Sequence, residues 1–166
     1  MSMISVDIGP AHFLYRVGGV CLHDGRVLLH RAVGDDFWSL PGGRCEILET
    51  ATDALTREMR EELAVEVTVG RLLWVVEDFF TMDGRPYHQI GLYFAVDLPD
   101  GCPLLDTEAV HAGQEGDDYL EFRWFPLSDL DQVRLYPTCV RTALQQPLDT
   151  PRHLVGRREP DPSPLR

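Results

Sequence analysis

Residues 42–65 of the chain read GGRCEILETATDALTREMREELAV. Two glycines and a short polar segment come first, and apolar residues then recur every three or four positions between Ala51 and Leu63. That period predicts an amphipathic helix from about Thr50 to Leu63, with Thr50 or Thr52 as its N-cap. The stretch therefore predicts a close-packed loop that leads directly into a helix.

Three glutamates of this helix, Glu58, Glu61 and Glu62, stand at positions i, i+3 and i+4, so their carboxylates share one face. Like charges at these spacings repel each other by about 0.2–0.5 kcal/mol per pair, and a divalent cation reverses that effect. Hard cations such as Mg²⁺ prefer carboxylate oxygens. The alternative is an ordinary solvated acidic face, which is the more common reason for such a triplet. The glycines before the helix favour the metal interpretation, because they let a ligand approach the backbone closely.

The spacing of Gly43, Glu49, residues 57–62 (REMREE) and Val65 resembles the signature box of the Nudix (MutT-type) hydrolases. That box reads GxxxxxE, seven residues, then REUxEExGU, where U is a bulky aliphatic residue. Eight of its nine specified positions match this chain. The departure is Ala64, where the box has a glycine that would end the helix in a left-handed conformation. Alanine makes that conformation harder by about 1 kcal/mol, or the helix ends differently.

The resemblance implies a Nudix-like α/β/α sandwich around a mixed sheet. It also implies hydrolysis of a diphosphate linked to another group, with Mg²⁺ as cofactor and Mn²⁺ as a substitute. By the same resemblance, the metal ligands are Glu58, Glu61, Glu62 and the backbone carbonyl of Gly43, and Glu58 and Glu61 count as catalytic. Two further box residues, Glu49 and Arg57, are expected to form a structural ion pair.

The general base of the family lies in the box in some members and in an outside loop in others. The outside candidate in this chain is Glu115, with Glu121 second, and an ordinary surface carboxylate is the alternative for each. Substrate contacts are expected from one arginine that can clamp a phosphate and from rings on which a base can stack. These candidates are Arg31, Trp38, Phe80 and His88. The alternatives are a surface ion pair of Arg31 with Asp35 or Asp36, rings packed in the sheet, and a structural histidine.

The rest of the chain reads as strands with helices between them. A single domain is expected over residues 1–146, and the Pro- and Arg-rich tail 147–166 is expected to be mobile, with a short strand at 153–155 as the alternative. Residues 99–118 are expected to form a polar loop. The expected strands are 14–23 and 26–31, joined as a hairpin by Asp24-Gly25, then 65–80, 88–98 and 119–127, and a second helix is expected over 136–146.

Composition excludes several function classes. All 15 basic residues are arginine, so Schiff-base chemistry and a GxxxxGK phosphate loop are excluded. A net charge of −12 argues against nucleic acid and anionic membranes as partners. No apolar run approaches the ~20 residues of a membrane helix, and the N-terminal residues do not lead us to expect a secretory signal. With four scattered cysteines, these features predict a reduced, cytoplasmic protein, and they leave monomer and homodimer both open.

The sequence thus predicts a metal-dependent hydrolase of a small nucleoside diphosphate derivative, in the class of nucleoside triphosphates, ADP-ribose and nucleotide sugars. One alternative is an RNA 5′-end pyrophosphohydrolase, which the lack of lysine and of a basic stripe weakens. The other is a Nudix-fold module that senses a nucleotide without turnover. Such a module has no chemical need for Glu58, Glu61 and Glu62 together, and all three are present.

Overall fold

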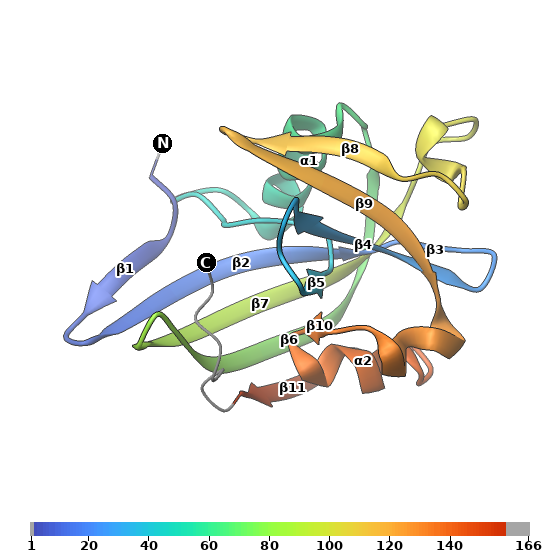
Figure 1. Cartoon of the computed structure of the whole chain (residues 1–166). Coiled ribbons are helices and arrows are strands. Elements are labelled where there is room, and N and C mark those ends of the chain that lie inside the picture. The colour runs from blue at the N-terminus through green and yellow to red at the C-terminus, as the bar shows by residue number, and fades with distance from the viewer. Residues whose placement is uncertain (1, 159–166) are drawn as a thin grey trace.

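A computed structural model describes residues 2–158, and these residues fold into two mixed sheets and two α-helices (Figure 1). The larger sheet has the strand order β1-β2-β7-β6-β11. Its strands β2 and β7 run parallel, as do β6 and β11, whereas β6 and β7 form a long antiparallel hairpin. The bounds are Ser5–Ile8 for β1, Ala11–Val20 for β2, Thr68–Met82 for β6, Arg85–Asp97 for β7 and Arg152–Arg157 for β11.

The second sheet has the order β10-β5-β4-β9-β8, and the short strand β3 pairs with β4 outside that path. Strands β4 and β9 form its antiparallel centre. The bounds are Leu22–His23 for β3, Arg26–Ala32 for β4, Trp38–Ser39 for β5, His111–Glu115 for β8, Asp118–Pro126 for β9 and Leu135–Tyr136 for β10.

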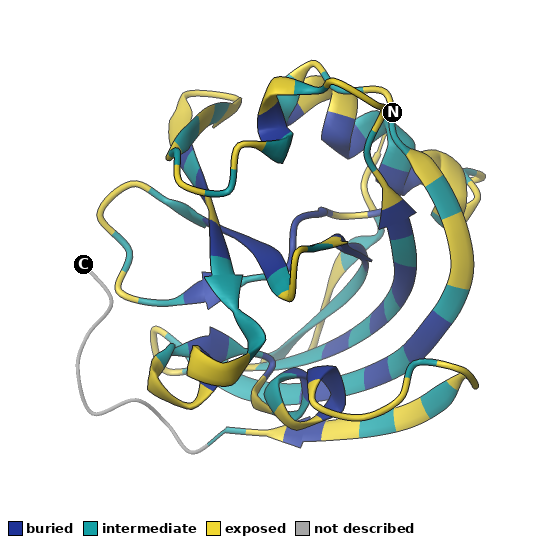
Figure 2. Ribbon diagram, turned by 90° about the vertical axis from the view of Figure 1, so that its right-hand side faces the viewer, coloured by how far each residue is buried: buried dark blue, intermediate teal, exposed yellow. Residues whose placement is uncertain are grey.

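The helices α1 (Ala51–Leu63) and α2 (Thr138–Leu144) pack on opposite faces of the larger sheet. Two short 3₁₀ helices, Pro103–Leu105 and Leu127–Gln132, complete the fold. One core cluster joins α1 to Val17 of β2 and Phe94 of β7, and the other joins α2 to Trp74 and Val76 of β6. Figure 2 shows buried residues alternating with exposed ones along the outer strands. The expected architecture, a mixed sheet with a helix on each face, is confirmed.

The expected hairpin over 14–31 is wrong in its pairing. Only Leu22–His23 pair with Arg26 and Val27, at the Asp24-Gly25 turn. Strand β2 instead pairs with β1 and β7 in the larger sheet. The reason is burial: residues 17–20 of β2 are buried, and a central strand with both neighbours in place provides that environment, whereas an isolated hairpin does not.

Two segments are more ordered than expected. The polar stretch 99–118 contains a 3₁₀ turn and the strand β8, which pairs with β9. Its sequence HAGQE lacks apolar alternation because β8 is an edge strand. In the expected tail, residues 152–157 form β11 along β6, which agrees with the alternative of a strand at 153–155, and residues 159–166 lie outside the described part. No helix within residues 2–158 is both long enough and apolar enough to cross a membrane.

Candidate functional site

Helix α1 begins and ends at the residues that the sequence singles out. Thr50 is the N-cap, and its hydroxyl accepts a hydrogen bond from the backbone N–H of Asp53. At the other end Ala64 has φ 56° and ψ 33°, so the chain keeps the left-handed conformation without the glycine of the box. The Ala64 N–H still donates to the carbonyl of Arg60 at 2.9 Å. The departure at Ala64 therefore adds local strain and leaves the helix end in place.

The loop before α1 is pressed between β2 and the helix. Gly42 has φ 146°, and a Cβ there would lie 2.1 Å from the Val17 carbonyl oxygen. A Cβ on Gly43 would lie 2.3 Å from the carboxyl carbon of Glu58. The Gly43 carbonyl accepts from the Val17 N–H at 2.8 Å. Two successive glycines are thus required sterically, because they let the loop backbone lie directly against β2 and beside the Glu58 carboxylate.

Arg57 binds the acidic residues of the box together. Its Nε and Nη2 donate to the two carboxylate oxygens of Glu49 at 2.8 and 3.0 Å, which is the ion pair expected from the sequence. Its Nη1 donates to Glu58 at 2.9 Å and to Glu61 at 3.2 Å, and Nη2 also reaches the carbonyl of Arg44. One guanidinium therefore fixes the loop to the helix and orients two of the three helix glutamates.

Glu58 and Glu62 are buried, which a solvated acidic face would not be. Their exposed fractions are 3% and 5%, whereas the Glu61 side chain is 59% exposed. Burial raises the pKa of Glu58, although the hydrogen bond from Arg57 opposes the shift. Burial and the negative charge of Glu115 raise the pKa of Glu62 to about 8. Neither carboxylate oxygen of Glu62 has a hydrogen-bond partner within residues 2–158.

These donors fit a hard divalent cation. A buried carboxylate with two unpartnered oxygens destabilises the protein unless a hydrogen-bond donor or a cation satisfies it. Mg²⁺ binds one or two carboxylates and completes its coordination shell with water and phosphate oxygens. Among the described residues, no three His, Cys, Asp or Glu side chains form a metal-binding group by themselves. A cation here would depend on Glu58 and Glu62, on a backbone carbonyl such as that of Gly43, and on water.

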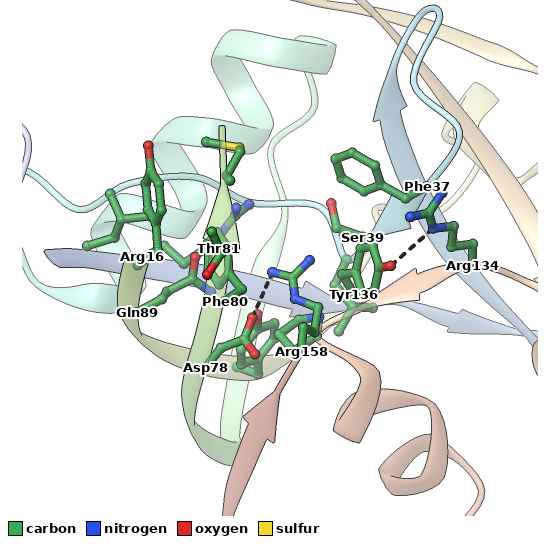
Figure 3. A pocket seen from close by; sticks show the side chains of 16 residues that line it. Arg16, Phe37, Ser39, Asp78, Phe80, Thr81, Gln89, Arg134, Tyr136 and Arg158 are labelled. Carbon is green, nitrogen blue, oxygen red and sulfur yellow. Dashed lines mark hydrogen bonds and ion pairs between the residues drawn. The ribbon is translucent and has the colours of Figure 1, made fainter. Parts of the chain in front are cut away.

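A cavity of about 250 Å³ opens near the glycine loop that precedes α1 (Figure 3). Five of its wall residues are aromatic: Phe37, Phe80, Tyr87, Tyr93 and Tyr136. Three arginines, Arg16, Arg134 and Arg158, also line it, with Asp78 and Gln89 between them. Arg16 connects the cavity to the glycine loop before α1, because its Nη2 donates to the Gly42 carbonyl at 3.2 Å.

The four substrate candidates do not come together. Phe80 lines the cavity and stacks on Tyr87 with ring centroids 5.0 Å apart. Trp38 is buried in the core, and Arg31 lies over its ring while it pairs with Glu121 and the carbonyl of Asp35. His88 lies on the opposite face of β7 from the cavity, stacked on Phe79 at 4.4 Å.

The two outside carboxylates have different surroundings. Glu115, at the end of β8, is exposed, makes no ion pair among the described residues, and lies close enough to raise the pKa of both Glu58 and Glu62. Glu121 is held by Arg31 and Arg123. Burial opposes these two contacts, but they still lower the pKa of Glu121. Of the two, Glu115 is the carboxylate that faces the helix glutamates unpaired.

Sequence reasoning missed Arg16, Asp78 and Arg158, which form the polar wall of the cavity. Asp78 is fully buried within the long apolar strand β6, and a carboxylate at such a position is the one signal that the sequence offers. The residues around Arg16 and Arg158 form no sequence pattern that points to a binding role. The two arginines meet Asp78 only through the parallel pairing of β2 with β7 and of β11 with β6.

Comparison with known proteins agrees with the box. The sequence-family model of the NUDIX domain matches residues 13–143. A putative ADP-ribose pyrophosphatase, YjhB of Bacillus subtilis, is 31% identical over 63% of this chain and 50% of its own length. The ADP-ribose pyrophosphatase of Methanocaldococcus jannaschii is 30% identical over 74% of this chain and 67% of its own. The chain thus spans half to two thirds of these curated relatives.

A solved structure of a MutT NUDIX hydrolase from Burkholderia pseudomallei superposes with a TM-score of 0.57. Its sequence is 30% identical, and the aligned region covers 81% of this chain and 97% of the other chain. The match of the domain model over most of the chain, the box on α1 and this superposition agree, and the chain therefore belongs to the NUDIX family.

Proposed function

We propose that the protein is a divalent-metal-dependent pyrophosphohydrolase that cleaves the diphosphate linkage of a small nucleoside diphosphate derivative. The substrate class is that of nucleoside triphosphates, ADP-ribose and nucleotide sugars. The observation that carries the proposal is the pair of buried carboxylates, Glu58 and Glu62, beside the Gly43 backbone, with both oxygens of Glu62 unsatisfied. Such a group destabilises the folded protein by itself, and it is well suited to binding a cation.

Charge explains why a cation is needed. The chain carries −12 and a diphosphate is itself polyanionic, so the helix carboxylates and the substrate repel each other. Glu58, Glu61, Glu62 and the Gly43 carbonyl would hold Mg²⁺, or Mn²⁺ in its place. When bound, the ion neutralises phosphate charge, polarises the phosphoryl oxygens and lowers the pKa of a bound water.

The chain's own residues supply the remaining roles. Arg16 has no carboxylate within ion-pair distance among residues 2–158, and it lies between the cavity and the glycine loop. Its guanidinium would bind the oxygens of a phosphate that lies next to the helix. Glu115 faces the same glutamates unpaired and takes the proton of the attacking water as general base. Arg57 keeps Glu49 and Glu58 in place.

The test is product formation from a panel of diphosphate compounds with Mg²⁺, with Mn²⁺ and with a chelator. The panel holds nucleoside triphosphates, oxidised nucleotides, ADP-ribose, nucleotide sugars, dinucleoside polyphosphates and a short 5′-triphosphorylated RNA. Glu62→Gln is expected to lower turnover by about 10²-fold or more, because it removes the unsatisfied carboxylate. Glu66→Gln is the matched control, since Glu66 is exposed and pairs with Arg60 away from the site.

Metal-dependent cleavage that Glu62→Gln abolishes and Glu66→Gln preserves would support the proposal, and the products would identify the phosphate attacked. Near wild-type turnover by Glu62→Gln would mean that the metal face is misassigned. Cleavage of the RNA alone would favour a decapping-type activity. Nucleotide binding without turnover of any compound would favour the sensing module.

A further inference from the structure

Arg158, the last described residue, lines the cavity, although it lies beyond the matched NUDIX domain, which ends at residue 143. Strand β11 runs parallel to β6, with Gly156 opposite Asp78 and Arg157 opposite Phe79. The N–H of Arg158 donates to the Phe79 carbonyl at 3.0 Å. This pairing brings the Arg158 side chain into the cavity, so a residue outside the matched domain lines it.

The Arg158 guanidinium lies between two aromatic rings. Its central carbon is 4.1 Å from the ring centroid of Phe80 and 4.1 Å from that of Tyr136. One terminal nitrogen donates to Asp78 at 3.0 Å, and the other points away from Asp78 (Figure 3). Tyr87 continues the stack on Phe80, with the two ring planes at 9°. Both faces and one edge of the guanidinium are therefore occupied, and further contacts are possible only in its plane.

The cavity has two ends with different charge. Arg158 is neutralised by Asp78, which is fully buried, so this aromatic end offers hydrogen-bond donors without net charge. Arg16 makes no ion pair among the described residues, although its charge also acts on Asp78 and Glu62, so the end near Gly42 offers an arginine that can bind a phosphate oxygen. Phosphate thus belongs at Arg16, and a planar, uncharged ring belongs at the Arg158 end, edge-on to the guanidinium and in its plane.

We propose that Arg158 determines base specificity by donating in-plane hydrogen bonds to the carbonyl-bearing edge of a nucleobase in this cavity. The inference rests on the proposed function for the phosphate end of the ligand. A guanidinium carries donors only. Guanine offers O6 and N7 as adjacent acceptors, and uracil and cytosine offer ring carbonyls, whereas adenine presents an amino donor beside N7, so a paired contact to that edge meets donor with donor. The cavity is therefore selective for carbonyl-bearing bases over adenine, and within the proposed substrate class it favours guanine, uracil and cytosine nucleotides over ADP-ribose.

Isothermal titration of the protein with GMP, UMP, CMP and AMP, once with Mg²⁺ and once with a chelator, tests this without turnover, because a monophosphate has no diphosphate linkage to cleave. The wild type is expected to bind at least one carbonyl-bearing monophosphate about fivefold or more tightly than AMP. Arg158→Ala is expected to remove that difference. Arg158→Lys keeps a charge beside Asp78 but loses the planar fork, and it is expected to remove the difference as well. Arg157→Ala is the matched control, since Arg157 is exposed and stacks on Phe79.

Equal or tighter binding of AMP by the wild type would overturn the proposal. It would also be overturned if a folded Arg158→Lys protein kept the preference, if Arg157→Ala lost it, or if none of the four monophosphates bound either with Mg²⁺ or with the chelator. Base-selective binding without hydrolysis of any diphosphate would leave this inference standing and would remove only the proposed hydrolase function. Hydrolysis with no difference between bases would do the reverse.

Discussion

Nδ1 of His30 lies 3.6 Å from Oε2 of Glu62 in the interior, and neither atom has a hydrogen-bond partner within residues 2–158. Burial, with the positive charge of Arg16, lowers the pKa of His30 to about 3. Burial also raises the pKa of Glu62 to about 8. Without metal, both groups are uncharged at neutral pH, so a cation that binds Glu62 must displace a proton.

Stability of the metal-free protein is expected to respond to pH in opposite directions through these two groups. The raised pKa of Glu62 gives stabilisation that is complete below the ordinary value of 4.5 and is lost as pH rises through about 8. The depressed pKa of His30 gives stabilisation that is present above the ordinary 6.5 and is lost as pH falls toward 3. Between pH 4.5 and 6.5 the two groups change the free energy of unfolding with pH in opposite directions, and their effects cancel. From pH 6.5 to 8, Glu62 alone lowers the free energy of unfolding by about 2 kcal/mol.

Urea unfolding at several pH values between about 4 and 8, without metal, measures this dependence. Because other groups also titrate, the decisive quantity is the difference between the wild type and Glu62→Gln. The variant is expected to lose the alkaline decrease, and Mg²⁺ is expected to reduce it in the wild type. An identical decrease in the wild type and the variant would show that Glu62 ionises normally in the folded protein.

Ala64→Gly is expected to raise the free energy of unfolding by about 1 kcal/mol. Ala64 has φ 56°, where a β-carbon is strained and glycine is not, and it lies after the site carboxylates. Ala51→Gly, at the first residue of the same helix, is the control and is expected to destabilise, because glycine is a poor helix former. Thermal and urea unfolding of the two variants give the comparison. A destabilised Ala64→Gly protein would mean that the methyl group contributes more by packing than it costs in strain.

Arg57→Ala is expected to lower the free energy of unfolding by about 2–4 kcal/mol and to lower activity as well. Both partners of the bidentate pair are largely buried, with side-chain exposures of 18% for Arg57 and 12% for Glu49. The change would leave the Glu49 and Glu58 carboxylates without their main donor. Arg60→Ala is the matched control: Arg60 lies on the same helix, but it is exposed and pairs with exposed Glu66. Equal stability losses in the two variants would remove the structural role assigned to Arg57.

The features that the sequence predicts well are those determined within one continuous segment. The Thr50 cap, the Arg57–Glu49 pair and the placement of Glu58 beside Gly43 all follow from residues 42–65. The burial of Glu58 and Glu62 is less visible, because β8 and the glycine loop cover a face that would be solvated on an isolated helix.

The cavity is the part that local patterns do not predict. Arg16, Asp78 and Arg158 converge through two parallel strand pairings between segments far apart in the chain. A shift of one residue in either pairing would turn these side chains to the opposite face of the sheet, where His88 lies. The substrate candidates His88 and Phe80 show the effect, since only Phe80 has the parity that faces the cavity.

Glu115→Gln is expected to lower kcat by about 10²-fold or more while leaving the free energy of unfolding nearly unchanged. Glu115 is exposed and makes no ion pair in the described part of the chain, so its loss removes a proton acceptor and no structural contact. Removing its charge is also expected to lower the pKa of Glu62, which Glu115 helps to raise. Glu121→Gln is the matched control, because Glu121 bridges Arg31 and Arg123 between β4 and β9. That variant is expected to lose stability and to keep kcat, as measured by steady-state kinetics and urea unfolding. If Glu121→Gln lost turnover and Glu115→Gln kept it, the general base would lie on β9, and the arginine contacts of Glu121 would serve to orient it.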